Sequence, residues 1–492
     1  MKNFISNFKN LNILQTYFII SSCLAIGYMS YLITSSNLFL RDFESYYFAG
    51  RDIVKHDTNI YSLDVKYQMA PKPFPELNGL LTPNINGSSS SILENPATNI
   101  EIPEIKQMED VTGLKAKILN PLFSPPYIYP PLLAYLMHPL SHFNIYTGYI
   151  IWNAILTLCL ILIPYSGIRI LEYNNVLNNR LSHLLVLFLS PLLFVFVIYD
   201  NFYWSQVNLI VVFLLMISFL YMDAKPNIAA ISFSLSFLIK MNPILIIFYF
   251  FLIKKYNFIL RIIFFTIVFI GITFAMGGYH HWVDFLRIIS DISKDNRAIR
   301  GLFPVIMEAN LSIKAFIYKI FSWKNPWISY YSYFISAFLL GYSVLQYFPT
   351  RTSRNQKGNS CQFEMNFTCK GLKINSHKII SESILLFRLV ILLLVSSPIF
   401  WFHHSILLYI NFIILLYLFF TFNFERIRII LLSLLFILTL FPLHFKFPIP
   451  QHKSNIYFIS LYEGYNLVLM LILFFSIEIL LKQNGRDLTT KD

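Results

Sequence analysis

Two carboxylates separated by one residue begin a stretch whose side chains could do acid–base chemistry. Asp42 and Glu44 are followed by the tyrosine pair Tyr46 and Tyr47, all directly after the first long apolar run. A carboxylate within hydrogen-bond reach of a hydroxyl can take its proton while that hydroxyl attacks an electrophile. Asp42 is therefore our candidate general base, with Glu44 and Asp52 as rivals. The simpler interpretation of Asp42 is a helix N-cap or a solvated loop carboxylate.

Basic side chains elsewhere in the chain could hold an anion. His403 and His404 lie beside an aromatic cluster between two apolar runs, and Lys240 interrupts a third apolar run just before Pro243. A leaving group that departs as an anion needs charge-assisted hydrogen-bond donors, which these residues would supply. The histidines could instead belong to an interfacial aromatic belt, and Lys240 could snorkel to the interface. No third metal ligand has suitable spacing, so we expect no metal and no other cofactor.

The elements that must position these groups are membrane spans. The 492-residue chain is 56% hydrophobic and 13% charged, with a mean hydropathy of +0.59, which is outside the range of soluble globular proteins. Its net charge of +13 falls largely in short loops between apolar runs, so it indicates membrane topology and not nucleic-acid binding. Four cysteines predict neither a disulfide framework nor a zinc site. We predict an all-α polytopic membrane protein.

The apolar runs predict about ten transmembrane helices, or about twelve if one broken run crosses twice. That run, 227–253, is followed by a basic cluster that a single crossing would place outside. A break at 240–243 would let it enter and leave on the cytoplasmic side. The predicted organisation has an anchor span at 1–36 without a signal-cleavage motif, a first external loop at 37–145 with an irregular insertion at 62–125, a transmembrane bundle at 146–276, a second external loop at 277–326, a C-terminal bundle at 327–482 and a cytoplasmic tail at 483–492.

The second external loop carries more basic residues than the positive-inside rule favours. Arg297 and Arg300 lie in it and are candidates for holding an anionic ligand, although a long loop obeys the rule weakly.

Several of these segments resemble, in the same order along the chain, the motifs of the polyprenyl-phosphate-sugar-dependent alpha-mannosyltransferase family of the GT-C glycosyltransferase superfamily. Ser205 departs from that pattern, because it stands where the family usually has glycine. The insertion at 62–125 has no counterpart in the family pattern. The matching elements are Asp42 with Tyr46-Tyr47, Tyr129-Pro130-Pro131, Gln206-Val207-Asn208, the break Lys240-Met241-Asn242-Pro243, Asn310-Leu311-Ser312, and the segment from Ser397 to His404.

The resemblance implies a GT-C type bundle with a long first external loop and an inverting transfer of a hexose, mannose above all. The donor would be a polyprenyl-phosphate-linked sugar in the membrane lipid, and the acceptor a glycolipid or glycan on the external face of the cell membrane. It implies that Asp42 is the base. It also implies a donor-phosphate site of His403, His404, Arg297, Arg300 and Lys240, and a substrate pocket of Glu44, Tyr46, Tyr47, Tyr129, Gln206, Asn208 and Asn310.

Two other classes of protein compete with this interpretation. A transporter or flippase of a lipid-linked sugar would show ionisable groups within spans or paired broken helices, and the sequence predicts one broken segment without an obvious mate. A structural membrane protein would have no reason to gather polar motifs on one predicted face.

Overall fold

The computed structural model describes residues 12–34, 42–54, 60–61, 127–173, 183–294, 311–321, 327–352, 376–397, 400, 402–421, 426–440 and 465–481. Within these ranges the chain is helical and has no strand, which confirms the predicted all-α class. The insertion at 62–125, Arg297, Arg300 and Asn310 lie outside the described residues.

Four helical stretches of the described chain are long and apolar enough to cross a membrane: α2 (Ile13–Thr34), α8 (Ile145–Tyr173), α15 (Tyr256–Ala275) and Phe402–Phe420. The last of these joins a 3₁₀ turn, η6 (Phe402–Leu407), to α20 (Leu408–Thr421). A bent pair makes a fifth span if it is counted as one. The described part of the chain therefore has four or five full-length spans plus shorter apolar helices, where the sequence predicted ten to twelve. Several predicted runs form helices too short to span, such as α12 (Asn208–Tyr221) with 14 residues, about 21 Å long.

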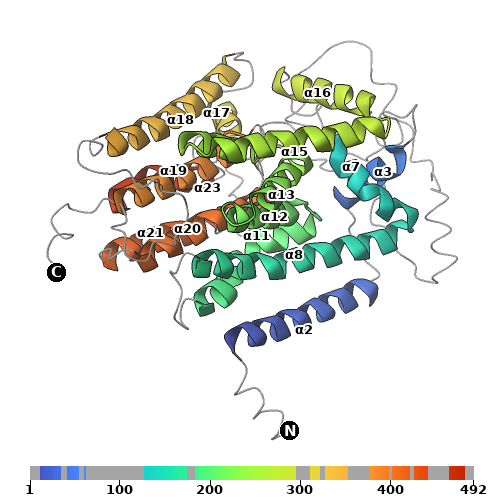
Figure 1. Ribbon diagram of the computed structural model, residues 1–492, viewed down its shortest axis with the longest axis horizontal. Helices are drawn as coiled ribbons and strands as arrows, with labels where there is room; N and C mark the ends of the chain where they lie inside the picture. Colours follow the sequence, from blue (N-terminus) through green and yellow to red (C-terminus); the bar gives the residue numbers. More distant parts are fainter. Residues whose placement is uncertain are drawn as a thin grey trace, which may run out of the picture.

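The helices pack side by side in one bundle (Figure 1). Helix α2 lies along α8, where the Tyr17 hydroxyl donates to the carbonyl of Ile161 at 2.8 Å. Helix α12 packs between α8 and α13 (Pro226–Ile239), and α13 packs against α15. The C-terminal part of the bundle consists of α18 (Ile328–Thr352), α19 (Ser376–Val395), α20, α21 (Arg426–Thr439) and α23 (Tyr465–Leu481).

The segment predicted to break does so at the expected residues. Helix α13 ends at Ile239 and α14 (Ile244–Leu252) begins after Pro243, with Lys240 in extended backbone between them. Lys255, just after α14, forms an ion pair at 2.9 Å with Asp223, just before α13. Both ends of the segment therefore meet at the same end of the bundle, and Lys240 is near its turning point.

A second broken helix precedes α12. A π-helical turn, η4 (Leu185–Leu189), leads into α10 (Ser190–Leu193), and α11 (Val195–Tyr203) follows at an angle of 62°. Phe194, between α10 and α11, has a non-helical backbone with φ of −93° and ψ of 8°, and the chain bends at this residue. The segment at 227–253 thus has a broken neighbour that the sequence did not predict.

Short helices cover one end of the bundle. Helix α3 (Asp42–Asp52) packs on α7 (Pro131–Met137) and on the 3₁₀ turn η3 (His138–His142), and Figure 1 shows α3 and α7 side by side there. Pro131 takes the first position of α7, where a helix has no use for a backbone N–H. Gly50 of α3 lies so close to Met137 that a Cβ would come within 2.8 Å of its backbone. Two further helices are α16 (Tyr279–Lys294), which contacts α7, and α17 (Ile313–Phe321).

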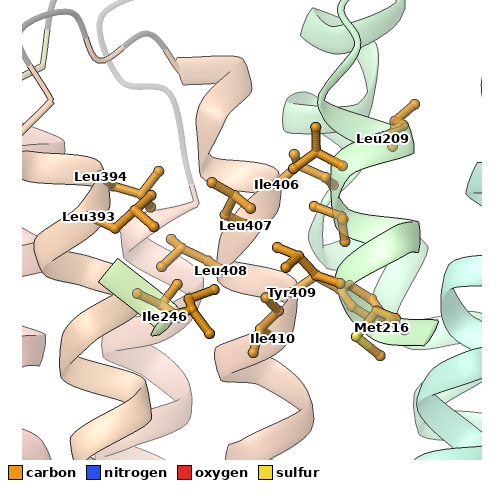
Figure 2. Close-up of a cluster of buried hydrophobic side chains, with 14 of the residues drawn as sticks. Leu209, Met216, Ile246, Leu393, Leu394, Ile406, Leu407, Leu408, Tyr409 and Ile410 are labelled. Atoms are coloured by element: carbon orange, nitrogen blue, oxygen red, sulfur yellow. The ribbon is translucent and has the colours of Figure 1, made fainter. Parts of the chain in front are cut away.

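An apolar core lies where α12, α14, α19 and α20 meet (Figure 2). Met216 of α12 lies beside Tyr409 of α20, and Leu209 of α12 and Ile406 of η6 belong to the same core. Since all four are almost fully buried, this packing fixes the start of α12 against η6. Helix α12 begins at Asn208 and η6 contains His404, so this packing helps to position two polar side chains of the site.

Candidate active site

Asp42, the candidate base, lies at the first position of α3 and is buried against the start of α12. The side-chain amide of Gln206 donates a hydrogen bond to Asp42 Oδ2. Asp42 is only 6% exposed, so its carboxylate depends on protein donors more than on bulk water for stabilisation of its charge. Helix α3 also helps, because the N-terminal end of a helix favours a negative charge.

Two tyrosines extend this contact into a chain of hydrogen bonds. The Tyr46 hydroxyl donates to the Tyr129 hydroxyl at 3.1 Å, and the Tyr129 hydroxyl donates to Gln206 Oε1 at 3.3 Å. Burial, followed by the negative charge of Asp42, raises the pKa of Tyr129 well above its usual value. Burial also raises the pKa of Tyr46. Both hydroxyls therefore keep their protons at neutral pH and remain donors.

A single ammonium group lies on the other side of Tyr129. Lys240 Nζ donates to Asn208 Oδ1 at 2.7 Å, lies 3.0 Å from His404 Nε2, and is 5.6 Å from the centre of the Tyr129 ring. The ring face attracts the cation, and Asp42 is close enough to interact with it electrostatically. An acidic and a basic group thus share one buried polar cluster.

The adjacent histidines point to different partners. His404 Nε2 faces the Lys240 ammonium, which can only donate, so His404 accepts there and carries its proton on Nδ1. His403 turns the other way, with Nδ1 3.2 Å from Asp200 Oδ2. The side-chain amide of Asn201 donates to the backbone carbonyl of His403 at 2.8 Å. The two rings are almost perpendicular, so only His404 lies in the cluster with Lys240.

The turn before α12 aims Gln206 at Asp42. Ser205 adopts a left-handed backbone with φ of 53°, which explains why the family pattern usually has glycine at this position. The indole of Trp152 donates to the Ser205 carbonyl at 3.0 Å, and the Gln206 backbone N–H donates to the Asn201 carbonyl at 2.8 Å. Two hydrogen bonds therefore hold a backbone shape that serine disfavours.

Two of the predicted substrate residues lie outside this cluster. The Tyr47 hydroxyl donates to the backbone carbonyl of Phe143 at 2.8 Å, on the side of α3 that faces α8. Burial raises the pKa of Glu44 to about 8, so this carboxyl holds its proton more firmly than an ordinary glutamate. Asp52, the other rival of Asp42, pairs with Arg51 at the far end of α3.

Within the described ranges no three His, Cys, Asp or Glu side chains lie close enough to hold a metal ion.

Asp200 and Asn201 are site residues to which sequence reasoning gave no role. They lie in the last turn of α11, and both support His403. The one available signal was an Asp-Asn pair shortly before Gln206, which also fits an ordinary polar turn.

Comparison with known protein families adds an independent finding to this geometry. The model of glycosyltransferase family 87 matches residues 127–359, a range that includes Tyr129, Gln206 and Lys240 but neither Asp42 nor His404. No curated protein and no solved structure matches the chain. The apolar helices and this match define a multi-pass membrane glycosyltransferase. Residues 127–359 thus match glycosyltransferase family 87, a GT-C family of polyprenyl-phosphate-sugar-dependent mannosyltransferases.

Proposed function

We propose that the chain transfers a hexose, mannose above all, from a polyprenyl-phosphate donor to a glycolipid or glycan acceptor on the external face of the membrane. The observation that carries the proposal is the buried cluster that joins the Asp42 carboxylate to the Lys240 ammonium through Gln206 and Tyr129. Transfer of a sugar from a phosphate needs a base for the nucleophile and a cation for the leaving group. The cluster contains one of each.

In the proposed reaction, Asp42 takes the proton of an acceptor hydroxyl while its oxygen attacks the anomeric carbon of the donor. The new carbon–oxygen bond forms on the face opposite the leaving group, so the anomeric configuration inverts. The bond from the anomeric carbon to the phosphate oxygen breaks, and its electron pair leaves with the polyprenyl phosphate. Lys240 has three N–H donors; within the described part of the chain two of them point to Asn208 and His404, and the third is available for a phosphate oxygen.

The apolar helices support a donor with a long hydrocarbon tail. Such a tail can lie among membrane spans while its phosphate stays near polar side chains. The roles of Arg297, Arg300 and Asn310 in phosphate and sugar binding remain part of the proposal, on the strength of their predicted place in the second external loop. His403 belongs to the phosphate site in this proposal through the turn that it shares with His404.

The decisive experiment uses purified protein in lipid with a panel of polyprenyl-phosphate sugars, and measures release of the lipid phosphate together with sugar transfer. Asp42→Asn keeps the shape of the side chain but cannot accept the proton, so we expect turnover to fall about 10²–10⁴-fold with donor binding retained. Lys240→Met should mainly weaken donor binding, about tenfold or more. Asp52→Asn, on the same helix, is the matched control and should keep its activity.

Near-normal turnover in Asp42→Asn would refute the assignment of the base. A flippase is the second candidate, because the chain has two broken helical segments, α10 with α11 and α13 with α14. Movement of the donor across vesicles without transfer to any acceptor would favour that alternative.

A further inference from the structure

The side-chain amide of Gln206 binds other protein groups at both ends, an arrangement that sugar binding alone does not require. Its side chain is 1% exposed, and both ends of its amide are engaged by protein groups. The nitrogen end donates to the Asp42 carboxylate, and the oxygen end accepts from the Tyr129 hydroxyl. Through these two hydrogen bonds, the buried amide can orient Asp42 and Tyr129.

The orientation of this amide is fixed by its neighbours. A carboxylate accepts hydrogen bonds only, so the amide nitrogen must face Asp42 and the amide oxygen must face Tyr129. The Tyr129 hydroxyl can donate to that oxygen because it accepts in turn from Tyr46. Reversing the amide would place its oxygen against the Asp42 carboxylate and would lose that hydrogen bond. The three hydrogen bonds thus run in one direction, from Tyr46 through Tyr129 and Gln206 to Asp42.

The backbone holds Gln206 in place with the same specificity. The left-handed turn at Ser205 and the hydrogen bond from Trp152 set the direction of the chain just before it. The Gln206 N–H is bound to the Asn201 carbonyl, so the residue cannot rotate away without losing that contact.

We propose that Gln206 is a positioning residue for Asp42, and that the directed chain from Tyr46 through Tyr129 keeps the carboxylate ionised and oriented for the acceptor hydroxyl. The proposal rests on the proposed function of Asp42 as general base. A hydrogen bond donated to a carboxylate favours its charged form. Among the described residues, the charged and titratable groups that interact with Asp42 include the Lys240 ammonium and the hydroxyls of Tyr46 and Tyr129. Lys240 also favours the charged form, while the two tyrosines are neutral and act through the chain.

The test is the pH dependence of kcat/KM, whose acid limb reports the ionisation of the base in the free enzyme. Gln206→Met keeps the length of the side chain and removes the donor. We expect the acid limb to move to higher pH by about one to two units, because a hydrogen bond to a charged group is lost. Tyr129→Phe keeps the ring beside Lys240 and removes only the hydroxyl, so it should move the limb in the same direction by less. Tyr129→Phe also tests the positioning role if Gln206→Met fails to fold.

Tyr127→Phe is the matched control. Tyr127 is an equally buried tyrosine nearby, but its hydroxyl donates to the backbone carbonyl of Pro130 and has no part in the chain to Asp42. The acid limb of the kcat/KM profile should therefore be the same in Tyr127→Phe as in the natural chain. If Gln206→Met and Tyr129→Phe lower the rate equally at every pH with the limb unmoved, the positioning role is refuted. Because Asp42→Asn is measured in parallel, retained transfer in that variant would instead refute the proposed base.

Discussion

Replacing Ser205 by glycine should stabilise the protein without harming the site. Ser205 has φ of 53°, a conformation that costs an L-residue roughly 1–2 kcal/mol. Its hydroxyl is also buried and has no hydrogen-bond partner among the described residues, at a cost of about 1 kcal/mol or more. Glycine removes both penalties but adds freedom to the unfolded chain, worth about 0.5–1 kcal/mol. The net expectation is a gain of about 1–2 kcal/mol.

Two control variants separate these contributions. Ser205→Ala removes the hydroxyl and keeps the Cβ, so it should recover only the smaller part of the gain. Lys254→Gly tests the backbone contribution away from the site, because exposed Lys254 is the other described non-glycine residue with positive φ, at 65°.

Thermal unfolding of the purified protein in detergent measures the order of stability, which should be Ser205→Gly, then Ser205→Ala, then the natural chain. Sugar transfer should survive in Ser205→Gly, since Trp152 binds the backbone carbonyl, which glycine retains. A melting temperature for Ser205→Gly below that of Ser205→Ala would refute the reasoning, because it would mean that the backbone at this turn is not strained.

Two further predictions concern ionisable groups away from the cluster. Arg388→Met should destabilise the protein by about 2–4 kcal/mol, because Glu478 loses the ion pair of 2.8 Å that joins α19 to α23. The double variant Arg388→Met with Glu478→Met should recover much of that stability in the same thermal unfolding assay. Glu44→Gln should flatten the pH dependence of stability. The folded chain retains the Glu44 proton up to about pH 8, whereas the unfolded chain releases it near pH 4.5. The natural protein therefore loses stability as the pH rises between these two values. Melting temperatures at pH 5 and pH 8 measure this, and an equal effect of the substitution at both pH values would contradict it.

The parts of the molecule that sequence reasoning predicted are those with a local chemical signal. Lys240 before Pro243 in an apolar run marks a helix break, and α13 and α14 are separated there. Asp42, Tyr129, Gln206, Lys240 and His404 were chosen by type and motif, and the structure brings them into one cluster.

The features that sequence reasoning missed depend on partners far away in the chain. Asp200 resembles any turn carboxylate until His403, about 200 residues later, is placed beside it. The different directions of His403 and His404 come from the 3₁₀ turn, whose roughly 120° per residue separates neighbouring side chains. The bend after Leu193 lies in an apolar run that reads as one span. The shortness of α12 was missed for the same reason, since hydropathy does not show where a helix ends inside an apolar run.

The hydrogen bonds around Lys240 have a consequence for how the protein is made. Chain synthesis adds Asn208 before Lys240, but His404 follows more than a hundred residues later. During that interval the ammonium already occupies a helix break between apolar helices with only part of its final set of partners. The hairpin of α13 and α14 must therefore remain adjustable until η6 enters the bundle, and the site is completed late in biogenesis by docking of that turn against α12.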